Sequence, residues 1–214
     1  MMLRTKKFVA GTACAGALIF GASTTALAAN SDPGDHFSVA AGTVVKGHLK
    51  SGTNLKFTGT IDGVAITVNC STFTARGKIP AKGLTVKLSA PPTISGCHDS
   101  LGGTDTVRTN TTNGAWKLIE VDATGTADNK EPNTDHGVLS MPKAGAKFKS
   151  SILSSCTVTA APNGRASIRG RYNDINTIKD TNAAIPTKGS GCTTAANAHA
   201  TATVILSPKV HDTK

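Results

Sequence analysis

The fold is decided by residues 55–70, which read LKFTGTIDGVAITVNC. Apolar side chains fall on the odd positions of 55–61 and on the even positions of 64–70, as in strands with one buried face. The phase changes at Asp62-Gly63. An Asp-Gly pair between two alternating segments favours a two-residue turn, because both of its central residues need a positive φ. The stretch therefore predicts an antiparallel β-hairpin.

The same turn signal occurs twice more along the chain. The two turns are Asn113-Gly114, between residues 105–112 and 115–121, and Asn163-Gly164, between residues 156–161 and 165–172. Further candidate strands cover residues 37–41, 43–49, 84–89 and 198–206. In 84–89 the side chains of Leu84, Val86 and Leu88 share one face, and in 198–206 those of Ala200, Ala202, Val204 and Leu206 point inward.

Short strands rich in Thr and Val, separated by Gly and Pro, predict an all-β protein. The expected architecture is an antiparallel β-sandwich or a partly open barrel. A weak repeat of cysteine, strand and turn relates residues 70–121 to 156–206. Two similar halves and a single shared core both remain open, and the polar residues 123–137 between the halves are expected to form a solvated connection.

The first residues have the pattern of a secretory signal peptide. Arg4, Lys6 and Lys7 precede an apolar run over 8–20, and Ala26-Leu27-Ala28 offers a cleavage site. We expect residues 1–28 to be removed and residues 29–214 to form a secreted β domain. It would be extracellular, either free or associated with the cell wall, and no later segment is long and apolar enough to span a membrane.

Cysteine content agrees with export. The mature chain keeps Cys70, Cys97, Cys156 and Cys192, and an even number in an exported protein indicates disulfides. Sequence allows three pairings, of which we favour 70 with 97 and 156 with 192, so that each half is closed internally. Metal-binding cysteine sets use close pairs, and the spacing here supplies none.

Composition carries one resemblance. The signal peptide, the Ala, Thr and Gly content, and the motifs Ser95-Gly96-Cys97 and Ser190-Gly191-Cys192 resemble secreted, β-rich, four-cysteine proteins of uncharacterised function from actinobacteria. The resemblance covers most of the mature chain and implies class and location. It implies no activity.

No arrangement of residues predicts catalysis, a metal or a cofactor. His98-Asp99-Ser100 holds the residue types of a hydrolase triad, but neighbouring side chains diverge, and a polar turn after Cys97 is the better interpretation. Glu120 and Asp122 form a possible carboxylate pair that is more typical of a solvated strand face. The six histidines lack ligand spacing, and no glycine-rich phosphate loop follows a strand.

The basic net charge and the placement of the basic residues are the features of the sequence that indicate a class of partner. Removing the signal takes away three of the 23 basic residues and none of the 13 acidic ones, which leaves a net charge of +7. Arg165, Arg169 and Arg171 share a face of one predicted strand, while Lys147 and Lys149 flank an inward Phe148. These five residues are candidate anion-binding residues. Few aromatic residues are free for stacking, so we expect no specific nucleic-acid recognition.

The sequence thus favours a secreted, non-enzymatic basic protein of the cell envelope or extracellular space. Its partner would be an anionic cell-wall polymer or a secreted protein. One alternative is a secreted protease inhibitor, with residues 180–191 before Cys192 as a candidate exposed loop. A second is an extracellular hydrolase.

Overall fold

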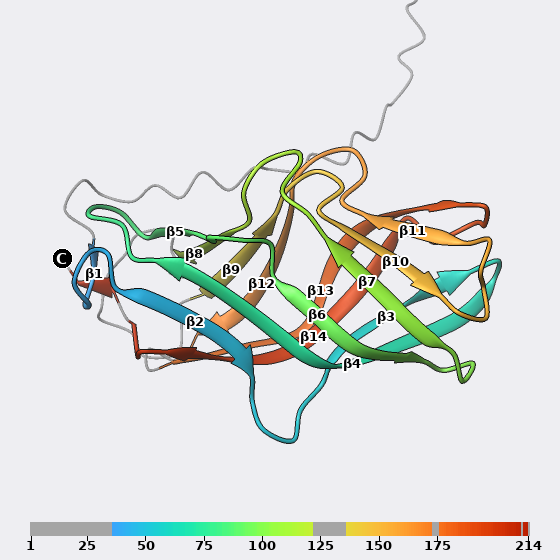
Figure 1. Cartoon of the computed structure of the whole chain (residues 1–214), viewed down its shortest axis with the longest axis horizontal. Helices are drawn as coiled ribbons and strands as arrows, with labels where there is room; N and C mark the ends of the chain where they lie inside the picture. Colours follow the sequence, from blue (N-terminus) through green and yellow to red (C-terminus); the bar gives the residue numbers. More distant parts are fainter. Residues whose placement is uncertain (1–35, 122–135, 173–175, 211, 214) are drawn as a thin grey trace, which may run out of the picture.

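The computed structural model describes residues 36–121, 136–172, 176–210 and 212–213 (Figure 1). These residues form strands joined by turns, with no helix among them. One sheet has 13 strands, and β1 and β15 pair in a second sheet. The strands are β1 (His36–Phe37), β2 (Val44–Leu49), β3 (Leu55–Ile61), β4 (Val64–Lys78), β5 (Thr85–Lys87), β6 (Thr93–Asp99), β7 (Thr104–Thr109), β8 (Lys117–Val121), β9 (His136–Met141), β10 (Ala146–Ser150), β11 (Thr157–Ala160), β12 (Ala166–Tyr172), β13 (Thr177–Ser190), β14 (Asn197–Ser207) and β15 (Asp212–Thr213).

Eight strands close on themselves as an antiparallel barrel. The circuit runs β3, β4, β6, β7, β10, β11, β13 and β14, and β14 returns to β3. The all-β, antiparallel prediction is confirmed, and of the two expected architectures the chain adopts the barrel. Closure leaves these eight strands without a free edge. We call this circuit the barrel.

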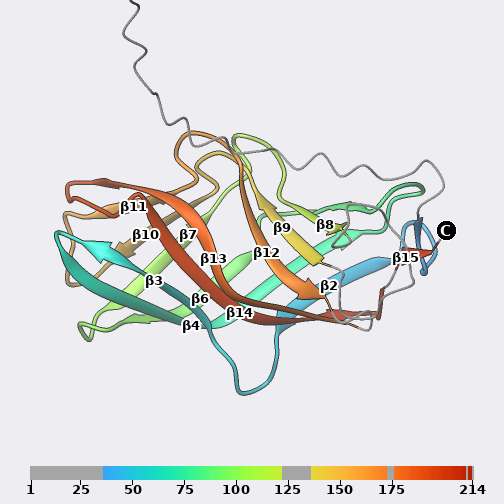
Figure 2. The same ribbon diagram turned by 180° about the vertical axis from the view of Figure 1, so that it is seen from behind.

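Three barrel strands continue beyond it and carry a second set of strands (Figure 2). β2 pairs with the far parts of β4 and β14, while β12, β9, β8 and β5 follow one another from the first residues of β13. A bridge between Gly77 and Leu88 joins β5 back to β4. We call β2, β5, β8, β9 and β12 the extension. In Figure 1 it occupies the end of the molecule that also carries β1.

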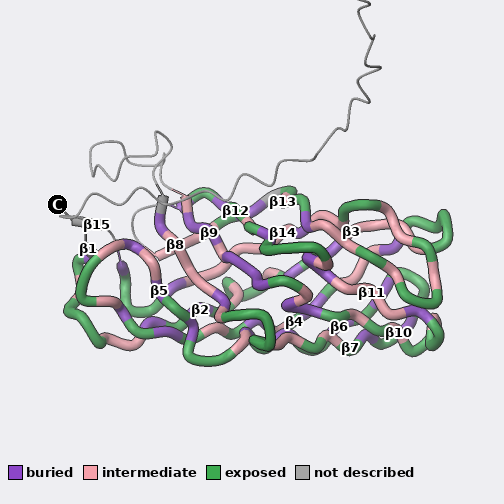
Figure 3. The backbone as a smooth tube through the Cα atoms, turned by 90° about the horizontal axis from the view of Figure 1, so that it is seen from above, coloured by how far each residue is buried: buried purple, intermediate pink, exposed green. Residues whose placement is uncertain are grey.

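Buried residues alternate with more exposed ones along much of these strands (Figure 3). Leu84, Val86 and Leu88 are all buried, as their shared face predicted. The side chains of β14 predicted to point inward also lie in the interior, since Ala200 and Leu206 are buried and Ala202 and Val204 pack against buried residues. Buried residues form two clusters, one centred in the barrel and one in the extension.

The Asp62-Gly63 hairpin is confirmed, and the other two hairpins are wrong. Asp62 and Gly63 have φ of 49° and 79°, and they join β3 to β4 with Ile61 opposite Val64. In contrast, β7 pairs with β6 and β10 but not with β8, and β11 pairs with β10 and β13 but not with β12. The segments around Asn113-Gly114 and Asn163-Gly164 instead pass from the barrel to the extension.

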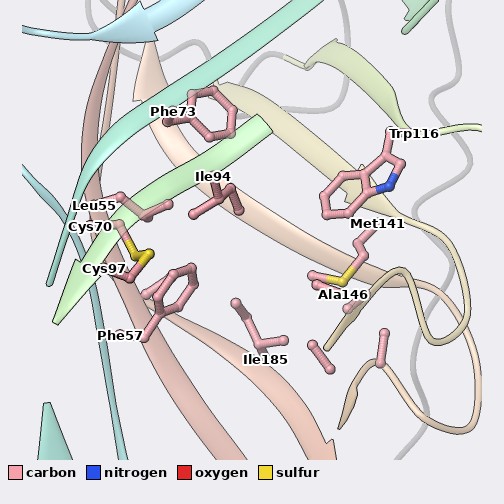
Figure 4. Close-up of a cluster of buried hydrophobic side chains, with 14 of the residues drawn as sticks. Leu55, Phe57, Cys70, Phe73, Ile94, Cys97, Trp116, Met141, Ala146 and Ile185 are labelled. Atoms are coloured by element: carbon pink, nitrogen blue, oxygen red, sulfur yellow. A yellow bond between two sulfur atoms is a disulfide. The ribbon is translucent and has the colours of Figure 1, made fainter. Parts of the chain in front are cut away.

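Both favoured disulfides are present, Cys70–Cys97 and Cys156–Cys192. Cys70 and Cys97 face each other across β4 and β6 and are fully buried (Figure 4). The second disulfide ties the residue before β11 to the connection between β13 and β14. Both disulfides therefore lie in the barrel, and neither joins strands of the extension.

Candidate ligand cavity inside the barrel

An apolar cavity of about 160 Å³ lies among the inward side chains. Interiors normally leave few voids larger than one water molecule, whose share of liquid volume is about 30 Å³. Phe57, Phe73, Trp116 and Ile185 surround this interior from different strands and connections (Figure 4). Phe148 packs edge-on against Phe57, with ring centroids 4.9 Å apart. Large side chains therefore form a rigid wall.

Small residues at inward positions account for the space. Ala146, Ala160 and Ala200 are each almost fully buried and line the cavity. Gly59 also lines it, and a methyl group at that residue would only reach ordinary contact with Ala198, at 3.4 Å. A barrel of eight strands is just wide enough for side chains to fill it, so small residues in several strands leave room for a ligand.

Few polar groups reach the cavity wall. The polar residues along it are Thr58, Thr60, Asp180, Thr187 and Thr194, together with Arg76, whose side chain is exposed to solvent. The carboxylate of Asp180 is already engaged: its Oδ1 accepts hydrogen bonds from the backbone N–H groups of Asn182 and Ala183, each at 3.0 Å, across a β-bulge. The wall therefore selects apolar molecules, because a polar ligand would lose its hydrogen bonds to water on entering.

Trp116 is the single tryptophan of the chain and is 1% exposed. It lies on the connection from β7 to β8, and its indole Nε1–H donates to the carbonyl of Asn110 at 2.9 Å. Its ring lines the cavity at the seam between barrel and extension. Tryptophan fluorescence consequently reports on this cavity alone.

A pair of buried aspartates lies at the turn between β6 and β7. Asp99 Oδ1 accepts from the N–H groups of Leu101 and Gly103, and its Oδ2 accepts from the Ser150 hydroxyl at 2.6 Å. Burial opposes ionisation of Asp99, but these hydrogen bonds, together with nearby His98, outweigh it and lower its pKa. The predicted polar turn after Cys97 is thus wrong for His98 and Asp99, which belong to β6.

The pKa of Asp105, which lies near Asp99, is shifted in the opposite direction. Burial and, to a smaller degree, the charge of Asp99 raise its pKa to about 6, against the opposing effect of His98. Its Oδ2 is buried without a hydrogen-bond partner among the described residues. The register places Asp105 opposite Cys97 and Ser150. The pairing of Asp99 with Asp105 was not predicted from the sequence, although an Asp ahead of Ser100-Leu101-Gly102-Gly103 is typical of a turn in which the carboxylate caps the backbone.

The predicted anion-binding residues occupy two separate places. Arg169 and Arg171 are exposed on the outer face of β12, as the alternation indicated. Lys147 and Lys149 are exposed on β10, which neighbours β7 and β11 rather than β12. Arg165 is partly committed to structure, since its guanidinium donates to Ser140 Oγ and to the carbonyl of Ala115, both at 3.0 Å.

The candidate inhibitor loop over 180–191 is wrong. Residues 180–190 belong to β13, which pairs with β14 along one edge and with β11 and β12 along the other. Pro186 interrupts no pairing that the barrel needs, because its carbonyl still accepts from the N–H of Ala161. A strand paired on both sides presents no free loop to a protease.

Comparisons with family models, curated proteins and solved structures return no match to this chain. Within the described ranges no helix is long and apolar enough to cross a membrane. Among those same residues, no group of three His, Cys, Asp or Glu side chains is placed to hold a metal ion. Residues 122–135, which include Asp122, lie outside the described part of the chain.

Proposed function

We propose that this protein is a secreted, non-enzymatic binding protein that holds a small apolar molecule inside its barrel. The observation that carries the proposal is the 160 Å³ cavity with its apolar wall. Signal-like residues 1–28 and the two disulfides support a location outside the cytoplasm.

The volume limits the ligand. An engineered cavity of about 150 Å³ lined by Leu, Ile and Phe stays dry and binds benzene. The cavity here is of that size, so a single aromatic ring or a short branched hydrocarbon fits, and an extended lipid does not. The aromatic side chains of Phe57, Phe73 and Trp116 would give such a ring favourable edge and offset contacts.

Binding can be tested with benzene on the mature, oxidised protein. Trp116 fluorescence should change in a saturable way, and the melting temperature should rise. At a benzene concentration of 100 times Kd, linkage gives about 2.7 kcal/mol, or roughly 5–10 °C for a domain of this size. A folded protein that shows neither response at saturating benzene would exclude the cavity as a binding site.

A cavity-filling variant provides the decisive comparison. Ala200→Leu places an isobutyl group in the interior, whereas Ala65→Leu makes the same change at an exposed residue of β4. We expect Ala200→Leu to abolish the benzene response and Ala65→Leu to keep it. If Ala200→Leu does not fold, Ala146→Val makes a smaller change at another wall residue. Equal responses in a folded wall variant and in Ala65→Leu would contradict the proposal.

A further inference from the structure

Five cations lie together on the outer face of the extension and the adjoining part of β4. The register places Lys46 on β2 opposite Arg76 on β4, and Lys87 on β5 opposite Lys117 on β8. The antiparallel bridge between Gly77 and Leu88 sets Lys78 beside Lys87. We call Lys46, Arg76, Lys78, Lys87 and Lys117 the cation row.

Its members are accessible to solvent. Lys46, Arg76, Lys78 and Lys87 are exposed, and Lys117 is half-buried. Within the described residues none of the five forms an ion pair with a carboxylate. Like charges directly opposite each other across a sheet are destabilising. Replacing one residue of each opposed pair by Gln or Thr would therefore remove an electrostatic repulsion from the folded state.

The spacing identifies the kind of anion. Neighbouring strands lie about 4.8 Å apart, so Lys78, Lys87 and Lys117 span roughly 10 Å across three strands. A chain with repeated phosphate groups can contact all of these ammonium groups at once, each with a different phosphate. Arg76 lies two residues along β4 from Lys78, and Lys46 lies opposite Arg76 on β2, so the row also extends to a fourth strand.

Base recognition is not part of this site. Phe37, Phe57, Phe73, Trp116 and Tyr172 are all buried, and Phe148 packs against Phe57. The described aromatic side chains therefore offer no exposed platform on which bases could stack. Contacts would be to phosphate groups alone, which makes affinity depend on salt and on polymer charge rather than on base sequence.

We propose that the cation row binds a linear phosphate polymer, laid across β4, β5 and β8 on the outside of the molecule. This function is separate from apolar binding in the cavity. The polymer neutralises ammonium groups that otherwise repel one another, so binding also stabilises the extension.

The experiment measures binding of long-chain inorganic polyphosphate over a salt series. Lys78→Gln/Lys87→Gln/Lys117→Gln removes three charges from the row. Lys50→Gln/Lys56→Gln/Lys143→Gln is the matched control, because it removes three exposed charges that belong neither to the row nor to the anion-binding residues predicted from the sequence. We expect the row variant to lose at least tenfold in affinity at 50 mM salt, and its salt slope to fall by about 2. The control should change less than threefold.

Three outcomes would overturn the proposal. They are equal losses in the two triple variants, no binding by the wild type at low salt, and orthophosphate binding as tightly as the polymer. Single-stranded DNA in a parallel titration tests whether the source of the phosphates matters, and the proposal requires affinities that follow charge and not base sequence. The benzene response of Trp116 should be unchanged in both triple variants, so failure here is distinguishable from failure of the cavity.

Discussion

The barrel and the extension share three strands but are closed by different means. The barrel contains both disulfides and the confirmed Asp62-Gly63 hairpin. The extension has no disulfide, and its buried cluster draws on residues far apart in sequence, from Phe37 to Val210. A void of about 20 Å³ lies in the extension, whereas the main cavity of about 160 Å³ is lined by residues of both regions, such as Ala146 of the barrel and Val86 of the extension. The two regions therefore share one cavity and differ in their covalent closure.

The largest loss of stability is expected at the seam. Trp116→Ala removes a fully buried ring that packs with Met141 and Leu88, and such truncations cost about 3–5 kcal/mol. Chemical denaturation of the oxidised protein measures the change. Leu101→Ala, at an exposed turn residue of the barrel, is the control and should stay within about 0.5 kcal/mol. A small loss in Trp116→Ala would mean that barrel and extension do not depend on this contact.

Removing the disulfides comes next. The closed loops span 27 and 36 residues, and restriction of the unfolded chain gives about 3.6 and 3.8 kcal/mol. Cys70→Ala/Cys97→Ala should cost more than Cys156→Ala/Cys192→Ala despite its shorter loop, because Cys70 and Cys97 are fully buried while Cys192 is half-buried. Urea denaturation of both double variants tests this order, and the reverse order would show that loop length dominates.

The barrel and the extension should differ in local stability, and a single substitution in the extension should have a smaller effect than loss of a disulfide. Val86→Ala in the extension deletes two buried methyl groups and should cost about 2 kcal/mol. Hydrogen exchange should show faster opening of β5 and β8 than of β6 and β7, because the staples hold only the barrel. Uniform acceleration across all four strands would mean that barrel and extension unfold as one unit.

The smallest effect concerns pH. Asp105 has a folded-state pKa raised to about 6, so the folded protein binds more protons than the unfolded chain between pH 4 and 6. Stability from this residue is present at low pH and is lost as pH rises through 6. Asp105→Asn should therefore stabilise the protein at pH 7.5 by on the order of 1 kcal/mol, after allowance for solvent screening, and flatten this part of the pH profile. Thermal melting from pH 4 to 8 measures it.

Asp99 provides the opposing control for that profile. Its pKa is lowered, so its contribution is present at neutral pH and is lost on acidification through the folded pKa. Asp99→Asn should destabilise the protein at pH 7.5. If both variants changed stability in the same direction at this pH, the assignment of the two environments would be wrong.

Local patterns predicted local structure well. Alternation located β2, β3 and β14, and it identified the inward faces of β14 and of the segment around β5. Asp62-Gly63 formed its hairpin because the strands it joins are partners. Asn113-Gly114 and Asn163-Gly164 have the same local chemistry, but their flanking strands pair with distant segments. A turn signal fixes a change of direction, and long-range pairing decides which strands meet.

Patterns within single strands could not predict the two candidate sites, because each site is assembled from several strands. The cavity results from small residues such as Gly59, Ala146 and Ala200, each unremarked in its own strand. The cation row joins β4, β5 and β8, whose lysines are separated by turns and by other strands. Arg165, Arg169 and Arg171 were visible in the sequence because they lie close together along the chain, Arg165 just before β12 and the other two within it. Sites assembled across strands require the topology before they can be recognised.

The position of β14 in the chain sets the order in which the protein can assemble. β14 completes the barrel by joining β13 to β3, and it also pairs with β2 in the extension. A chain that is synthesised from its N-terminus exposes β2, β3 and β4 long before residues 197–207 arrive. The barrel cannot close until then, so the pairings of β14 with β2 and β3 form late and across large sequence separations, which is a condition for slow folding. Disulfide Cys70–Cys97, whose partners emerge early, can lock one strand pair during that interval and protect it from mispairing with a neighbouring chain.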